Sequence, residues 1–362
     1  MFFGCCCKSS VNNYWVRKFA DEYPCNVLAE VDVEKFRDTG NDSMDYPQPR
    51  DVVGSGDTIV VVSTDPSNGW GWTPTTWMRH IYDLDLELIR ADKWNTPYAM
   101  HHTNGTRTAF GNATARTIDV FDSSAQLVCS VSVGASDFLT AVCMDAANNI
   151  YGATYQTSGG FRLVFVTKWN ATGSFQWKTT LEGSFSAMTV GEMEYADDGA
   201  VWALSGNYQQ SDLRRLQAGG GFSGVSGPFG ATSSGGTYHP LLRAAANKMW
   251  RIDTSTTLWQ LRRYSTTPTQ DTVWGTGLSG PGLNATCANG DTAVWVSNPY
   301  QVVKYTGSVQ QYNWSTASPW GYAGGFNVCW ENGFGPLGMA FHSNHVYGAS
   351  TRTAKLTRRY PY

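Results

Sequence analysis

A repeat that runs through most of the sequence is the feature that most restricts how this chain can fold. From Asp51 onward the same pattern recurs: a turn of Gly, Asn or Asp residues, then a short apolar segment that holds one large residue. The large residues of the seven units are Val61, Phe110, Tyr151, Trp202, Trp250, Trp295 and Tyr347. Consecutive members lie 41 to 52 residues apart, a spacing too regular for unrelated loops.

A second set of residues follows the first in constant order, each on a segment that ends in a polar turn. Its members are Leu84, Phe121, Trp169, Leu216, Tyr264, Tyr305 and Leu356. Because the two sets belong to different predicted hairpins, each unit holds about four strands. Repeats of roughly 40 to 50 residues with four strands are typical of β-propeller blades. The sequence therefore predicts an all-β fold, a seven-bladed β-propeller.

The two ends of the chain are predicted to complete one blade together. After Gly348 the last unit retains the segment 353–360, which is enough for a third strand but not for a fourth. Residues 27–33 alternate like a half-buried strand whose Glu30 and Asp32 face solvent. We expect this N-terminal strand to join the last blade, because that closes the ring and removes an exposed edge.

These assignments divide the chain into two parts. Residues 27–362 form the β-propeller, with the closing strand at about 27–33 and the blades over about 51–362. Residues 1–26 form an extended N-terminal arm. Charged residues make up 28% of residues 1–50 against 15% of the whole chain, which is consistent with a solvated arm.

Composition excludes several classes of partner. The net charge of −3 offers no basic field for nucleic acid, so we expect no nucleic-acid partner. No run approaches the roughly 18 apolar residues that span a bilayer, and we expect no membrane partner. The first residues lack the basic region of a secretory signal, so no cleaved signal is expected.

The repeat resembles propellers of the quinoprotein-like and related repeat families, whose blades often hold phrases such as Lys168-Trp169-Asn170 beside a Gly turn. This resemblance implies the architecture alone, since propellers host enzymes, receptors and scaffolds. The segment from Asp197 to Trp202 also partly resembles the Asp-box of sialidase propellers, with Tyr195 in place of its Ser. In that family the box is structural.

The cysteines support few predictions. For Cys5, Cys6 and Cys7 in the arm we consider interchain disulfides, acylation or no role, and we assign them to assembly. Cys143 and Cys287 each precede a turn and are expected to be small buried core residues.

Metal and cofactor sites are not expected. His101 and His102 are adjacent and His342 and His345 lie three apart, but neighbouring strand residues point in different directions. The segment from Asp145 to Asn149 could offer oxygens to Ca²⁺, yet it is also ordinary turn chemistry. We therefore predict neither a metal nor a cofactor.

Loop aromatics are the remaining candidate binding residues. Trp70, Trp72 and Trp77 crowd into a Gly/Pro-rich segment, and Trp320 and Tyr322 form a second such group. Exposed Trp and Tyr side chains stack on sugars or anchor partner proteins. The alternative is that these rings fold back over the core.

Function is predicted from what the sequence lacks as much as from what it holds. It shows no nucleophile elbow, phosphate loop or zinc-protease helix, so we expect no enzyme. We predict a non-catalytic structural and interaction protein in an oligomer, specifically a bacteriophage virion component of the neck, tail or fibre. It would dock on other virion or assembly proteins through its arm and propeller face.

Two alternatives remain. The first is an extracellular glycan-binding propeller, whose ligand would be a host-surface glycan. The second is a propeller enzyme of the quinoprotein or glycosidase type, which paired carboxylates on the axis would favour.

Overall fold

The fold was analysed in a computed structural model of the chain. The structure describes residues 27–32, 48–64, 76–185, 189–196, 198–206, 210–230, 242–243, 248–253, 260–265, 270–275, 285–290, 293–298, 301–306, 309–315, 336–350 and 355–359. Within these ranges all regular structure is β: 28 strands form seven four-stranded antiparallel sheets.

The first four sheets are built from strands consecutive in the chain, each sheet starting with its innermost strand. The first contains β2 (Gln48–Ser55), β3 (Thr58–Thr64), β4 (Trp77–Asp83) and β5 (Leu88–Trp94). The second contains β6 (Met100–Thr103), β7 (Arg107–Asn112), β8 (Thr117–Asp122) and β9 (Leu127–Ser132). The third contains β10 (Phe138–Met144), β11 (Ile150–Ser158), β12 (Phe161–Trp169) and β13 (Phe175–Phe185). The fourth contains β14 (Thr189–Tyr195), β15 (Val201–Gly206), β16 (Gln210–Leu216) and β17 (Phe222–Gly230).

Two further sheets follow the same rule, and the last recruits a strand from the other end of the chain. The fifth contains β18 (Leu242–Arg243), β19 (Met249–Asp253), β20 (Gln260–Tyr264) and β21 (Gln270–Gly275). The sixth contains β22 (Ala285–Asn289), β23 (Ala293–Asn298), β24 (Gln301–Thr306) and β25 (Val309–Ser315). The seventh contains β26 (Pro336–His342), β27 (His345–Ser350), β28 (Lys355–Arg359) and β1 (Val27–Asp32).

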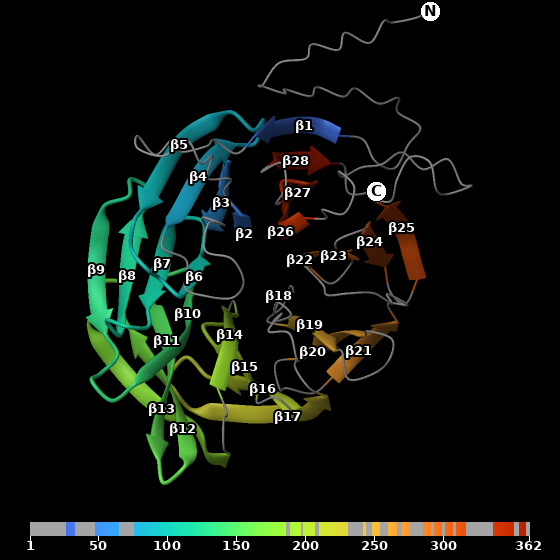
Figure 1. The fold of residues 1–362 in the computed structure, drawn as a ribbon. Helices are drawn as coiled ribbons and strands as arrows, with labels where there is room; N and C mark the ends of the chain where they lie inside the picture. The colour runs from blue at the N-terminus through green and yellow to red at the C-terminus, as the bar shows by residue number, and fades with distance from the viewer. Residues whose placement is uncertain are drawn as a thin grey trace, which may run out of the picture.

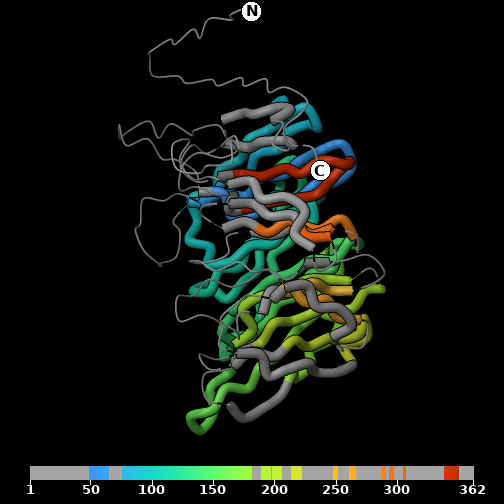
Figure 2. The backbone as a smooth tube through the Cα atoms, turned by 90° about the vertical axis from the view of Figure 1, so that its right-hand side faces the viewer, coloured from blue at the N-terminus to red at the C-terminus, as the bar shows by residue number. Residues whose placement is uncertain are grey.

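The sheets stand around a central axis as the blades of a β-propeller. Figure 1 shows β2, β6, β10, β14, β18, β22 and β26 next to the axis and the fourth strands on the outer rim. Seen from the side in Figure 2, the molecule is narrower than the ring is wide, which gives it the shape of a disc. The inner strands therefore decide which side chains meet at the axis.

The predicted ring closure is confirmed. β1 pairs antiparallel with β28, so that Val31 faces Leu356 and Asp32 faces Lys355 in register. The last blade is thereby completed by the N-terminal strand, and the ends of the chain are joined by backbone hydrogen bonds. His342 Nε2 also lies 2.7 Å from the Gly56 carbonyl oxygen, which ties the last blade to the first.

The hydrophobic core lies between the blades, because each sheet buries both of its faces. On β3, Ile59 and Val61 pack against the last blade with Tyr347, whereas Val60 and Val62 pack against the second blade with Phe110. Burial on both faces explains why this strand reads as an uninterrupted apolar run rather than an alternation. The seven large residues of the first set all lie on second strands, one per sheet, and are at most 1% exposed.

One five-residue turn recurs between third and fourth strands. Asp83, Asp122 and Asn170 each accept two backbone N–H groups, from the residues two and four positions later, on one side-chain oxygen. The fourth residue of each turn has a positive φ: 69° at Leu86, 57° at Ala125 and 85° at Gly173. Short polar side chains that bond their own backbone explain why Asp or Asn begins these turns.

These turns, and an equivalent turn from Gln217 to Gly221 between β16 and β17, link neighbouring blades on the outer rim. Arg90 of β5 donates to the Ser124 carbonyl (2.8 Å), and Trp177 Nε1 of β13 donates to the Ala218 carbonyl (3.1 Å). In these two blades the outer strand is held by the turn of the next blade.

Three sequence predictions fall on residues that the structure does not describe. These are the N-terminal arm, with Cys5, Cys6 and Cys7, the loop of Trp70 and Trp72, and the loop of Trp320 and Tyr322. Within the described residues, no helix is long and apolar enough to cross a membrane.

Candidate functional site

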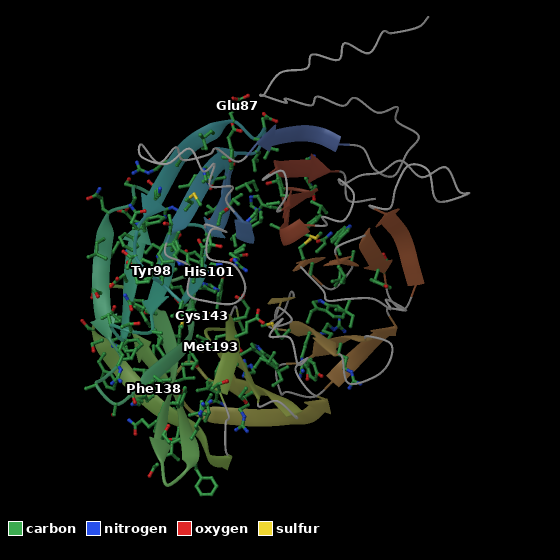
Figure 3. All side chains as sticks on the ribbon, viewed as in Figure 1. Glu87, Tyr98, His101, Phe138, Cys143 and Met193 are labelled. Carbon is green, nitrogen blue, oxygen red and sulfur yellow. The ribbon has the colours of Figure 1, made fainter. Side chains whose placement is uncertain are left out.

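A group of polar side chains lies where four inner strands approach the axis. We call it the axial cluster: Asp51 on β2, His101 and His102 on β6, Cys143 on β10 and Glu194 on β14. Figure 3 shows His101 and Cys143 on the axial side of their blades. The cluster joins residues of four consecutive blades that are far apart in sequence.

His102 is the centre of the cluster. Its Nε2 lies 3.8 Å from Cys143 Sγ and 3.8 Å from Glu194 Oε2. Its Nδ1 accepts a hydrogen bond of 3.2 Å from the Met144 backbone N–H. In the neutral ring the proton is therefore on Nε2, which faces both the thiol and the carboxylate.

His101 points toward the first blade instead. Its Nε2 lies 3.9 Å from Asp51 Oδ2, and its ring packs 4.8 Å from the ring of Trp77. The two histidines thus face different neighbours, as expected for adjacent strand residues.

The surroundings shift the pKa values of these groups strongly. Burial, and then the nearby Glu194 charge, raise the pKa of Asp51 to about 6, against the opposing effect of His102. Burial and the neighbouring His102 and Arg50 lower the pKa of His101 to about 3. For His102 burial lowers the pKa, whereas Cys143 and Glu194 raise it above the ordinary value. The hydrogen bond that Nδ1 accepts from Met144 N–H favours the neutral ring, because an imidazolium has no acceptor nitrogen.

The cluster is accessible to water although many atoms surround it. The side chains of Asp51 and Glu194 are 34% and 21% exposed, and those of His101 and His102 are 18% and 12% exposed. A water-accessible carboxylate whose pKa is raised to near neutrality, as that of Asp51 is, is typical of binding and acid–base sites. The arrangement can therefore bind a hydrogen-bond donor or a cation, or move a proton.

Nucleophilic chemistry is not supported by the cluster. Cys143 is fully buried, as the sequence predicted, and burial raises the pKa of its thiol. Both Cys143 and Glu194 face Nε2 of His102, whereas a catalytic triad places the base and the orienting group on opposite ring nitrogens. Among the residues that the structure describes, no group of three or more His, Cys, Asp or Glu side chains could hold a metal ion.

One predicted binding residue was assigned wrongly. Trp77 lies on β4, is 3% exposed and donates its Nε1–H to the Tyr98 carbonyl at 2.9 Å. It packs between the first and second blades and cannot stack on a ligand. The other predicted binding aromatics, Trp70, Trp72, Trp320 and Tyr322, stay predictions because they lie outside the described residues.

The segment that resembled a Ca²⁺ loop is an ordinary turn. Asp145 accepts bonds from Asn149 N–H, the Asn149 side-chain amide and the Tyr151 hydroxyl. Both carboxylate oxygens of Asp145 therefore accept hydrogen bonds from the protein, as in an ordinary turn. Cys287 is also buried, as predicted.

Sequence reasoning missed Asp51 and Glu194, yet the repeat held a signal for part of the cluster. His102, Cys143 and Glu194 each lie eight residues before the large residue of their unit, namely Phe110, Tyr151 and Trp202. Equivalent positions on inner strands of successive blades meet around the axis. Comparing this position across the repeat units would have brought the three residues together.

Comparison with known proteins supports the fold alone. No protein-family model matches the sequence, and no curated protein matches it. A streptogramin B lyase structure superposes with a TM-score of 0.58 at 12% identity, covering 87% of this chain and 94% of the lyase. BBS1N, solved in complex with ARL6DN, gives a TM-score of 0.53 at 13% identity, covering 92% of this chain and 98% of that one. BamB from Moraxella catarrhalis gives 0.50 at 12% identity, covering 92% and 97%. These similarities support the β-propeller fold.

Proposed function

We propose that this chain is a non-catalytic interaction protein that binds a cationic, hydrogen-bond-donating group of its partner at the axial cluster. The supporting observation is that two water-accessible carboxylates flank the adjacent histidines of β6: Asp51 lies 3.9 Å from His101 and Glu194 lies 3.8 Å from His102. The Glu194 charge also contributes to the raised pKa of Asp51. An ammonium or guanidinium group between them would relieve this repulsion and form charge-assisted hydrogen bonds.

Isothermal titration calorimetry tests this proposal with acetyl-arginine amide and its neutral isostere, acetyl-citrulline amide. We expect saturable binding of the arginine compound alone at pH 7.5. Binding should weaken as the pH falls below about 6, because protonation removes the charge of Asp51. It should be lost in the Asp51→Asn/Glu194→Gln double variant.

The matched control is Asp57→Asn, which removes an exposed carboxylate from the turn after β2 and should leave binding unchanged. Equal binding of both compounds, or unchanged binding in the double variant, contradicts the proposal.

The narrower proposal within this class is a structural component of a bacteriophage virion. A closed ring of repeats and a low charge suit a rigid building block. Fractionation of particles and detection of the protein in the particle fraction test it, and a protein that never associates with particles contradicts it. Glycan recognition is tested separately by a glycan array on the wild type and on Trp70→Ala/Trp72→Ala.

Acid–base catalysis is the second candidate function. One observation favours it: Asp51, with a pKa of about 6, lies beside a histidine that stays neutral down to about pH 3. A general base works best when its pKa is near the working pH. An activity that rises with pH around 6 and is lost in Asp51→Asn would favour catalysis over binding.

A further inference from the structure

The outer strand β9 has an open edge. It is the last strand of its sheet and pairs with β8 alone among the described strands. Leu127, Val128, Ser130 and Ser132 are exposed, with Leu127 at 57% and Val128 at 36%.

The hydrogen-bond pattern shows which backbone groups point outward. In the pair of β9 with β8, Val131 lies opposite Ile118 and Cys129 lies opposite Val120. The hydrogen bond from Val133 N–H to the Arg116 carbonyl (3.1 Å) continues this register by two residues. In an antiparallel pair the hydrogen-bonded positions alternate. The N–H and C=O groups of Cys129 and Val131 therefore point to β8, whereas those of Ser130 and Ser132 point away from the sheet.

The edge of β9 also lacks the charges and prolines that protect edge strands, although it has one register shift, between Leu127 and Cys129. Its sequence from Leu127 to Ser132 has no charge, no proline and no glycine. The outer strands of the adjacent blades are charged: β5 contains Arg90 and Lys93, and β13 contains Lys178. The pair of β13 with β12 also has three register shifts, against one in the pair of β9 with β8. Natural edge strands use charges, prolines and bulges to prevent pairing with other chains.

We propose that β9 is a dimerisation edge, at which two copies of this chain pair antiparallel through their β9 strands. A second copy fits because its β9 has the same length and is also uncharged. In a two-fold dimer each β9 covers the open edge of the other, so no open β9 edge remains. The pairing that uses all outward groups places Ser130 opposite Ser132 of the partner subunit and is centred on Val131. The two sheets then form one continuous eight-stranded sheet.

The central experiment measures molar mass by light scattering after size exclusion over a range of protein concentrations. The wild type should approach twice the 39.7 kDa mass of the chain. Ser130→Pro removes one outward N–H from a position where an edge strand tolerates proline, and should shift the protein to the monomer. Ser130→Ala is the matched control, since it loses the hydroxyl that donates to Asp119 (2.5 Å) but keeps the N–H, and it should stay dimeric.

A cross-link keeps the test decisive if the proline variant fails to fold. Residues opposite each other in a hydrogen-bonded pair have Cα atoms about 5.5 Å apart, within the range of a disulfide. The Ser130→Cys/Ser132→Cys double variant should form covalent dimers on mild oxidation in higher yield than either single variant. A monomeric wild type, a dimeric Ser130→Pro variant, or equal cross-linking in single and double variants overturns the proposal.

Discussion

At the scale of single residues, Asp51 of the axial cluster differs from the buried carboxylate of Asp92 in how well its charge is paired. Arg79 and Asp92 form an ion pair of 2.8 Å, and Arg90 adds a second contact of 2.6 Å to the same carboxylate. Such a pair satisfies its own charges. Asp51 instead has a raised pKa, which means that the fold holds its charged form at a cost.

We therefore expect Asp51→Asn to stabilise the protein at pH 7.5. A group whose folded pKa is raised from 3.8 to about 6 contributes stability that is complete below pH 3.8 and lost as the pH rises through 6. Because the side chain is 34% exposed, screening reduces the effect to about 1 kcal/mol. The gain measured by urea unfolding should shrink steadily between pH 6 and pH 4. A gain that does not depend on pH contradicts this account.

A second residue-scale prediction concerns Trp77. Trp77→Phe removes buried volume and leaves the Tyr98 carbonyl without its 2.9 Å indole donor, so the free energy of unfolding should fall by about 2 kcal/mol. Phe175→Ala is the control, since that side chain is 62% exposed and its loss should change stability by less than about 0.5 kcal/mol. Equal effects would mean that Trp77 is not part of the core.

At the scale of elements, the recurring turn between third and fourth strands both shapes a blade and contacts its neighbour. Gly220 has a φ of +87°, and a Cβ atom there would lie 2.8 Å from Trp177 Cδ2 on the preceding blade. Thr179 Oγ1 also donates to the Gly220 carbonyl at 2.7 Å. Glycine is required here for both conformation and contact.

Gly220→Ala should lower the free energy of unfolding by about 1–3 kcal/mol, because alanine is strained at positive φ and has no room beside Trp177. The adjacent Gly219 is a matched control, since a Cβ atom there meets nothing within 4 Å. Gly219→Ala should be neutral or slightly stabilising. Chemical unfolding of both variants measures the difference, and equal values would contradict the inter-blade contact.

At the scale of the whole molecule, stability depends on ring closure by β1. Without it, β28 would present an open edge and the seventh sheet would lose one of its four strands. The core that joins Tyr347 and Ala349 to Val52 and Val61 would then be held by a weakened blade.

A chain that begins at residue 34 should unfold at a lower temperature than one that begins at residue 24 and retains β1. Calorimetry compares the two. A synthetic peptide of residues 27–33 should raise the unfolding temperature of the shorter chain in a concentration-dependent way, because it binds the folded ring. Identical unfolding temperatures for the two chains would show that closure by β1 is dispensable.

Much of the fold could be predicted because its determinants are local. The Asp or Asn turns follow from side chains that bond their own backbone, and the large residue of each unit marks a strand buried on both faces. The missing strand in the last unit, together with the alternation at residues 27–33, was enough to predict the pairing of β1 with β28.

The candidate site could be predicted only in part, since its contacts cross between blades: the repeat gives His102, Cys143 and Glu194 one shared position, but no contact distance and no place for Asp51. Glu194 is 92 residues from His102 in the sequence, and only the ring brings their atoms to 3.8 Å. Trp77 was likewise predicted to be a loop residue, but it begins β4 and packs between the first two blades. By itself the sequence determined the strands, their repeat and the closing strand, because turn chemistry and burial act over a few residues. The tertiary structure decided which side chains meet at the axis and which edge stays open, because these depend on how separate sheets pack around one centre.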